Sequence, residues 1–215
     1  MTVNSELKAG CRLRTVNCKL LAMFLKRESP HSLVIGMTGV KMGDRFLQVG
    51  CANGARMAAV AGKVGLSGRA VVVAPDEASA ARARRGAASE GVLVEIEVAP
   101  PTKLPVEEAA FDLAVIDDSG GVLGLASPAD RVAAIREVRR ALRPGGRVMI
   151  VGALPRGGIG AIFSRAQAGA PFAASGDANK ALEADGFRSV RTLAEREGLV
   201  FVEGVKPRDV SGQRA

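Results

Sequence analysis

Two adjacent carboxylates, Asp117 and Asp118, are the residues of this sequence best suited to chemistry. They end the apolar run FDLAVID (111–117), which predicts a buried strand, so both would stand where that strand meets a loop. Paired carboxylates at such a place serve as a general base or bind a cationic substrate. The same residues also suit a pair that caps a loop, and the sequence leaves both interpretations open.

A turn rich in small residues, QVGCANG (48–54), is the second candidate site. It follows a short apolar run and precedes a predicted helix. Gly50, Ala52 and Gly54 would let the backbone of this turn approach a ligand closely, because none of them carries a large side chain. The turn therefore predicts close contact between backbone and a bound molecule.

Three other side chains are candidates, each with a purely structural alternative. Asp76 follows a predicted strand, where an acid accepts hydrogen bonds from ribose hydroxyls, but it also suits the N-cap of the next helix. Cys51 would have a lowered pKa at a helix N-terminus, or would fill space as a small buried residue. His31, the only histidine, would lie near the pocket or on the surface. One histidine and three cysteines without a CxxC pattern predict no metal site.

The elements that would position these residues alternate along the chain. Short apolar runs predict strands, and a cap followed by a first-turn proline, Ser127-Pro128, begins one of the helices between them. The predicted strands span 45–50, 70–74, 92–98, 111–117, 147–152, 187–193 and 199–205. This alternation predicts βαβ units in a parallel, doubly wound α/β sheet. The last two strands are separated by AEREG, which predicts an antiparallel hairpin.

Composition bounds the remaining possibilities. With 215 residues, 47% hydrophobic and 24% charged, the chain fits one large domain or two small ones, and a disordered protein is excluded. No run approaches the ~18 uncharged apolar residues of a membrane-spanning helix. No secretory signal pattern is visible and the cysteines form no paired framework, so we expect a cytoplasmic protein with reduced thiols.

The formal net charge of +8 is concentrated in an N-terminal arm. Residues 1–27 hold six basic side chains against one acidic one, and helically spaced apolar residues predict a helix over 12–27. Residues 8–27 would meet nucleic acid or another anionic surface, or form a solvated helix face. We expect a basic, partly helical extension over 1–43, an α/β domain over 44–206 and a tail over 207–215.

Three stretches carry a resemblance to a known family. They are DRFLQVGCANG (44–54), VVVAPDEASAARAR (71–84) and REVRRALRPGGRVMIV (136–151). Over 44–206 the chain resembles the class I S-adenosyl-L-methionine (SAM)-dependent methyltransferases, in their type-11-like branch. The resemblance implies a Rossmann-like seven-stranded sheet of order 3-2-1-4-5-7-6 with strand 7 antiparallel. It also implies SAM as the cofactor and a small or lipid-like methyl acceptor.

The resemblance implies a degenerate cofactor site, because the three family acids fall on Gln48, Ala74 and Pro100. The middle glycine of the family turn is Ala52. Each lost charge-assisted hydrogen bond is worth about 1.5–3 kcal/mol, so we expect SAM to be bound weakly or not at all. The implied cofactor positions are Gln48, Gly50, Ala52, Gly54, Ala74, Asp76 and Pro100, with Asp117 and Asp118 facing the substrate.

Three functions therefore stay open. The first is methyl transfer from SAM to a small or lipid-like acceptor. The second is a non-catalytic pseudo-methyltransferase that acts as a binding or assembly module for a protein partner. The third is a nucleic-acid-binding module that uses the basic arm, although the chain has no Tyr or Trp on which single-stranded bases could stack.

Overall fold

The structure is a computed structural model that describes residues 31–154 and 172–208. The chain divides into two compact units, residues 1–32 and 33–215, and all described strands belong to the second. The helix expected over 12–27 and the basic surface over 8–27 lie outside the described residues. Within the described ranges, no helix combines the length and the apolar character that crossing a bilayer requires.

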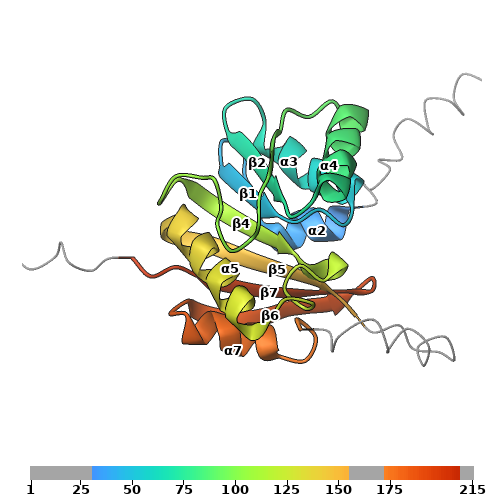
Figure 1. The fold of residues 1–215 in the computed structure, drawn as a ribbon. Coiled ribbons are helices and arrows are strands. Elements are labelled where there is room, and N and C mark those ends of the chain that lie inside the picture. The colour runs from blue at the N-terminus through green and yellow to red at the C-terminus, as the bar shows by residue number, and fades with distance from the viewer. Residues whose placement is uncertain (1–30, 155–171, 209–215) are drawn as a thin grey trace, which may run out of the picture. The chain divides into compact units, whose positions relative to one another are not determined.

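A seven-stranded sheet forms the centre of the second unit (Figure 1). The strands are β1 (Arg45–Val49), β2 (Arg69–Ala74), β3 (Glu95–Val98), β4 (Phe111–Asp117), β5 (Leu142–Ala153), β6 (Arg188–Arg196) and β7 (Leu199–Val205). Their order is β3-β2-β1-β4-β5-β7-β6, and the first five strands pair in parallel. β7 runs antiparallel to β5 and β6. The predicted sheet order and the antiparallel seventh strand are confirmed.

Helices cover both faces of this sheet (Figure 1). One face packs against α2 (Ser32–Thr38), α3 (Gly54–Val64) and α4 (Glu77–Glu90); the other packs against α5 (Pro128–Ala141) and α7 (Asp177–Ala184). Alternation along β1 explains the two layers, because Phe46 joins the core under α2–α4 while Leu47 and Val49 join the core under α5 and α7.

The helices α3, α4 and α5 begin where the sequence supplies a side-chain cap. Asn53 accepts a hydrogen bond from Arg56 N at the start of α3, and Asp76 accepts one from Ser79 N at the start of α4. Ser127 caps α5 in the same way, directly before a proline in the first turn. Each cap satisfies an N–H group that has no partner inside its helix.

Three predicted strand boundaries are wrong by three residues or more. β6 ends at Arg196 rather than at 193, because residues 194–196 of the predicted link AEREG pair with β7. β3 begins at Glu95 rather than at 92, because Val92 N donates to Ala87 O and so takes part in the turn that follows α4.

β5 begins at Leu142 rather than at 147: after the pair between Leu142 and Phe111, residues RPGG (143–146) form an irregularity, and regular pairing with β4 begins at Arg147. Gly145, with φ +80°, allows this detour and donates its N–H to Lys206 O.

Two glycines bring α3 and α4 into backbone contact. A Cβ on Gly54 would lie 2.1 Å from Arg82 O, and a Cβ on Gly86 would lie 2.2 Å from Gly54 O. Neither position therefore tolerates a side chain without movement of a helix. The contact places the N-terminus of α3, which follows β1, against the middle of α4.

Replacing Gly86 by Ala should destabilise the domain by about 1–3 kcal/mol, because the added methyl group forces two backbones apart. The loss is expected although alanine is the better helix former by about 1 kcal/mol. Gly62→Ala in α3 is the matched control, since its Cβ would lie 3.4 Å from Val92 Cγ2, an ordinary contact. Urea unfolding measures both variants, and equal stabilities would contradict the close approach at Gly86.

Candidate functional site

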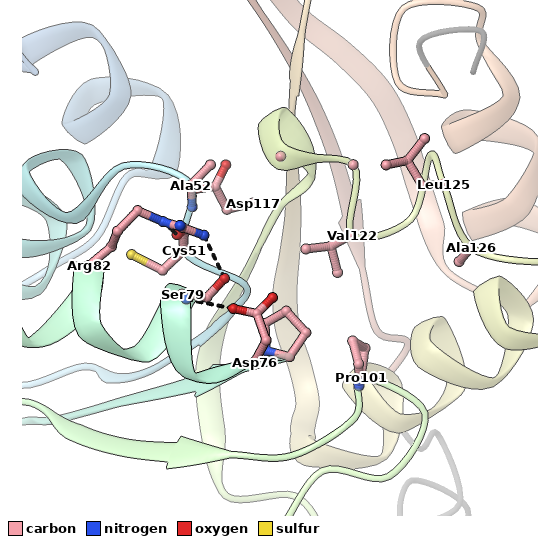
Figure 2. Close-up of a pocket in the computed structure, with 13 residues that line it drawn as sticks. Cys51, Ala52, Asp76, Ser79, Arg82, Pro101, Asp117, Val122, Leu125 and Ala126 are labelled. Carbon is pink, nitrogen blue, oxygen red and sulfur yellow. Dashed lines mark hydrogen bonds between the residues drawn. The ribbon is translucent and has the colours of Figure 1, made fainter. Parts of the chain in front are cut away.

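A pocket of about 330 Å³ opens at the carboxyl ends of β1, β2 and β4 (Figure 2). Its walls come from the turn after β1, the start of α4, the loop after β3 and the segment after β4. The lining residues are Cys51, Ala52, Pro75, Asp76, Ser79, Arg82, Pro101, Asp117, Gly120, Gly121, Val122, Leu125 and Ala126.

The position of this pocket follows from the strand order. The chain proceeds from β1 outward to β2 and β3, then crosses back to place β4 on the other side of β1. The connections after β1 and β4 therefore leave the sheet toward opposite faces, and a crevice opens between them. Such a switch point is where open α/β sheets bind their ligands.

Asp117 ties together the two turns that border the pocket. Its side chain, 2% exposed, accepts hydrogen bonds from Ala52 N at 2.9 Å and from Arg56 Nη2 at 2.7 Å. Ser119 Oγ donates to the same carboxylate at 2.6 Å and also lies 2.5 Å from Arg56 Nη2. The buried negative charge is thus compensated by a guanidinium and by hydrogen bonds to both oxygens.

Arg82 holds the same turn from the other side. Its Nε donates to Cys51 O at 2.8 Å, and its Nη2 donates to Ser79 Oγ at 2.7 Å. Two backbone groups of the turn, Cys51 O and Ala52 N, are therefore hydrogen-bonded to side chains of the protein. The turn is complete in its hydrogen bonding at Cys51 O and Ala52 N without any ligand.

Asp118 does not line the pocket. Its side chain is 7% exposed, and its Oδ1 accepts hydrogen bonds from Leu123 N at 2.7 Å and Gly124 N at 2.8 Å. Burial raises the pKa of this carboxyl, partly offset by the two backbone N–H donors. Of the two interpretations that the sequence left open, the contacts of Asp118 match a carboxylate that caps a loop.

Of the seven implied cofactor positions, Ala52 and Asp76 line the pocket. Asp76 also caps α4, accepting from Ser79 N at 2.7 Å, and this N–H holds the pKa of the Asp76 carboxyl below its usual value. The Asp76 side chain is exposed, and its carboxylate borders the cavity (Figure 2). The capping role and the ligand-facing position are therefore combined in one residue.

The other five positions do not line it. Gln48 is 3% exposed and donates from Nε2 to the Gly50 carbonyl at 2.9 Å, while Ala74 is completely buried. Pro101, not Pro100, reaches the wall. Gly50 has φ +79°, and a Cβ there would lie 2.6 Å from Val122 Cγ2; Gly54 is required by α4. Internal packing alone thus accounts for both glycines.

Two other candidates have separate outcomes. Burial, followed by the charge of Asp117, raises the pKa of the Cys51 thiol to about 11. The prediction of a lowered pKa at this position is wrong, because burial of the thiol disfavours the charged thiolate. His31 belongs to the unit 1–32, and its place near the pocket stays a prediction. No group of three or more potential ligands in the described residues is placed to hold a metal ion.

Sequence reasoning missed Arg56 and Arg82. A partial signal existed for Arg82, because Ser79 precedes it by three residues and side chains at this spacing share a helix face. No signal existed for Arg56, since its partner Asp117 is 61 residues away. Only the sheet topology brings the ends of β1 and β4 together.

A family model described as a methyltransferase domain matches residues 46–146. This range runs from β1 to the first residues of β5. It therefore includes every residue that lines the pocket.

Two curated relatives are similar over about half of the chain. The 27-O-demethylrifamycin SV methyltransferase of Amycolatopsis mediterranei is 33% identical over 117 residues, which make up 54% of this chain and 40% of the relative. The ubiquinone/menaquinone biosynthesis C-methyltransferase UbiE of Cupriavidus taiwanensis is 26% identical over 117 residues, 54% of this chain and 46% of the relative. The chain thus spans less than half the length of these relatives.

Solved structures share the fold at low identity. A SAM-dependent methyltransferase from Aquifex aeolicus aligns with a TM-score of 0.63 at 18% identity, covering 87% of this chain and 97% of that one. The cyclase SpnF aligns with a TM-score of 0.61 at 18% identity, covering 83% of this chain and 80% of that one. One fold here carries more than one chemistry.

Replacing Asp117 by Ala should lower the free energy of unfolding by about 3–5 kcal/mol, because it leaves a buried guanidinium without its carboxylate. The Arg56 side chain is only 12% exposed. Glu95→Ala is the matched control: it breaks the surface pair Arg69–Glu95, whose side chains are 36% and 56% exposed, and should cost at most about 1 kcal/mol. Similar losses in the two variants, measured by urea unfolding, would show that Asp117 has no bracing role.

Proposed function

We propose that this pocket binds SAM weakly and supports methyl transfer to a small or lipid-like acceptor. The premise is that residues 46–146 belong to the class I methyltransferase family. The observation that carries the proposal is the position of the pocket at the switch point between β1 and β4, with walls from the ends of β1, β2 and β4 (Figure 2). When bound, SAM supplies a methyl group on a sulfonium centre.

The residues around the cavity fit an adenosyl ligand in part. Asp76 presents an exposed carboxylate that we assign to the ribose hydroxyls. Pro101, Val122 and Leu125 provide apolar walls for a flat heterocycle. Ala52 keeps the turn after β1 free of a large side chain, so the ligand can approach the backbone.

The same residues explain why we expect weak binding. Ala74 offers no acceptor and is completely buried, and the Gln48 amide is turned to Gly50 O. Asp117 is already occupied by Ala52 N, Arg56 and Ser119. Asp76 is therefore left as the carboxylate available to the ligand among the lining residues.

The acceptor class rests on two observations. The relatives named above are a demethylrifamycin methyltransferase and a methyltransferase of ubiquinone and menaquinone biosynthesis. The rim of the pocket is apolar, and Leu125 within it is 64% exposed. An apolar side chain exposed at a pocket mouth favours an apolar occupant. In this reaction Asp117 braces the site rather than taking a proton, since its oxygens already accept four hydrogen bonds, from Ala52 N, Arg56 Nη2, Ser119 N and Ser119 Oγ.

A non-catalytic role is the second candidate. The observation in its favour is that Arg82 and Asp117 satisfy Cys51 O and Ala52 N without a ligand. A turn whose Cys51 O and Ala52 N are already hydrogen-bonded within the protein needs no cofactor for its stability. In that case the domain would act as a binding or assembly module.

Asp76→Asn should weaken binding of SAM and S-adenosylhomocysteine about tenfold, because one charge-assisted hydrogen bond is lost. Asparagine caps helices as well as aspartate does, so α4 should remain intact. Glu77→Gln is the matched control: it removes the neighbouring charge, which pairs with Arg84 outside the pocket, and should not change affinity. Calorimetric titration that gives equal affinities for Asp76→Asn and the unmodified chain would exclude Asp76 as a ligand.

Ala74→Asp should strengthen binding of the same two ligands about tenfold, because it restores an acceptor at the end of β2. The gain should be largest together with Gln48→Glu and Pro100→Asp, since the contacts share one ligand. Because Ala74 is buried, thermal unfolding of each variant is measured beside its affinity.

Tight SAM binding by the unmodified chain, in the low micromolar range, would refute the degenerate site. Titration without detectable binding in the unmodified chain and in all the restored variants would refute the methyl-transfer proposal. The non-catalytic role would then take its place.

A further inference from the structure

The segment after β4 forms one side of the pocket and has little regular structure. It begins with a short 3-10 helix, η1 (Asp118–Gly120), and reaches Ser127, where α5 is capped. We call residues 119–126 the rim loop. It contributes five of the lining residues: Gly120, Gly121, Val122, Leu125 and Ala126. A loop with three glycines and an exposed leucine needs contacts outside the pocket to keep its shape.

Asp118 supplies such contacts from the end of β4. Its Oδ1 accepts the N–H groups of Leu123 at 2.7 Å and Gly124 at 2.8 Å, in a place where Asp118 is 7% and Leu123 0% exposed. Buried hydrogen bonds to a charged acceptor are stronger than those between neutral groups. The N–H side of the rim loop is therefore fixed at its centre.

Arg131, in the first turn of α5, holds the carbonyl side. Its Nε donates to Leu123 O at 3.0 Å, and its Nη2 donates to Ala126 O at 3.3 Å. The guanidinium carbon lies 4.4 Å from the centre of the Phe172 ring, which is itself 3% exposed. The planar fork of arginine makes both carbonyl contacts while its face stacks on the ring.

Leu123 is thus held at both backbone groups by two opposite charges. The Asp118 carboxylate receives its N–H, and the Arg131 guanidinium donates to its C=O. Val122 and Leu125, which face the cavity, flank this anchored segment. Because this part of the pocket wall is already ordered, ligand binding does not cost the entropy of ordering it, and the affinity is higher by that amount.

We propose that Asp118 and Arg131 are positioning residues that hold the rim loop ready for the adenosyl ligand without touching it. The inference rests on the proposed function for its ligand, but the ordering of the loop does not depend on that ligand. Phe172 extends the arrangement, because its carbonyl accepts Ala178 N at the start of α7. Arg131 therefore ties the pocket wall to the segment that leads into α7.

The experiment compares four variants by hydrogen exchange and calorimetry on the full chain. Arg131→Ala and Asp118→Ala should raise exchange at the Leu123 and Gly124 amides about tenfold, because a charge-assisted contact of the loop is lost. Both should weaken S-adenosylhomocysteine binding several-fold. Asp118→Asn keeps an oxygen that accepts both N–H groups but removes the charge, so its effects on exchange and affinity should be clearly smaller than those of Asp118→Ala.

Arg136→Ala is the matched control. It removes a guanidinium from the same helix, but Arg136 is 71% exposed and pairs with Asp185, away from the rim loop. It should change neither exchange in the rim loop nor affinity. Thermal unfolding of every variant separates loosening of the loop from loss of the fold, and Arg131→Ala serves if Asp118→Ala does not fold.

The outcomes are distinct. Faster exchange at Leu123 and Gly124 together with weaker ligand binding supports the positioning role. Exchange and affinity in Arg131→Ala equal to those of Arg136→Ala would overturn it. If the unmodified chain binds no S-adenosylhomocysteine, the proposed function fails, and the exchange data still test whether these two residues order the loop.

Discussion

The pocket depends on the Asp117 carboxylate. Two connections leave the sheet on opposite faces after β1 and β4, and nothing in the sheet itself joins their turns. Asp117, at the end of β4, accepts Ala52 N from one turn and Ser119 Oγ from the other, while Arg56 neutralises it. A buried carboxylate stays charged only when an opposite charge and hydrogen bonds offset its loss of hydration. The ion pair between Asp117 and Arg56 and the arrangement of the two turns therefore depend on each other.

Family glycines in this chain are explained by packing as well as by any ligand. Gly54 lies against the backbone of α4, and Gly50 combines a positive φ with close contact to Val122. These constraints belong to the fold, and they would hold equally in a chain that binds no cofactor.

The strand order followed from the resemblance to a known family, while local pattern predicted the α/β class, because short apolar runs alternate with helices along the chain. It failed at Leu142, where pairing with Phe111 begins before the loop-like RPGG, because pairing depends on a distant strand. The site was less predictable for the same reason. Ala52 and Asp76 follow strand ends and could be named, whereas the contact of Arg56 with Asp117 exists only after the sheet has assembled.

The charges around the cavity divide into those that build it and one that remains available. Asp117 is committed to Arg56, and Arg82 to Cys51 O and Ser79 Oγ. Asp76 also has a structural task, but its Oδ1 satisfies the cap with a single hydrogen bond from Ser79 N. A carboxylate has a second oxygen with its own lone pairs, so one side chain can start a helix and still face a ribose.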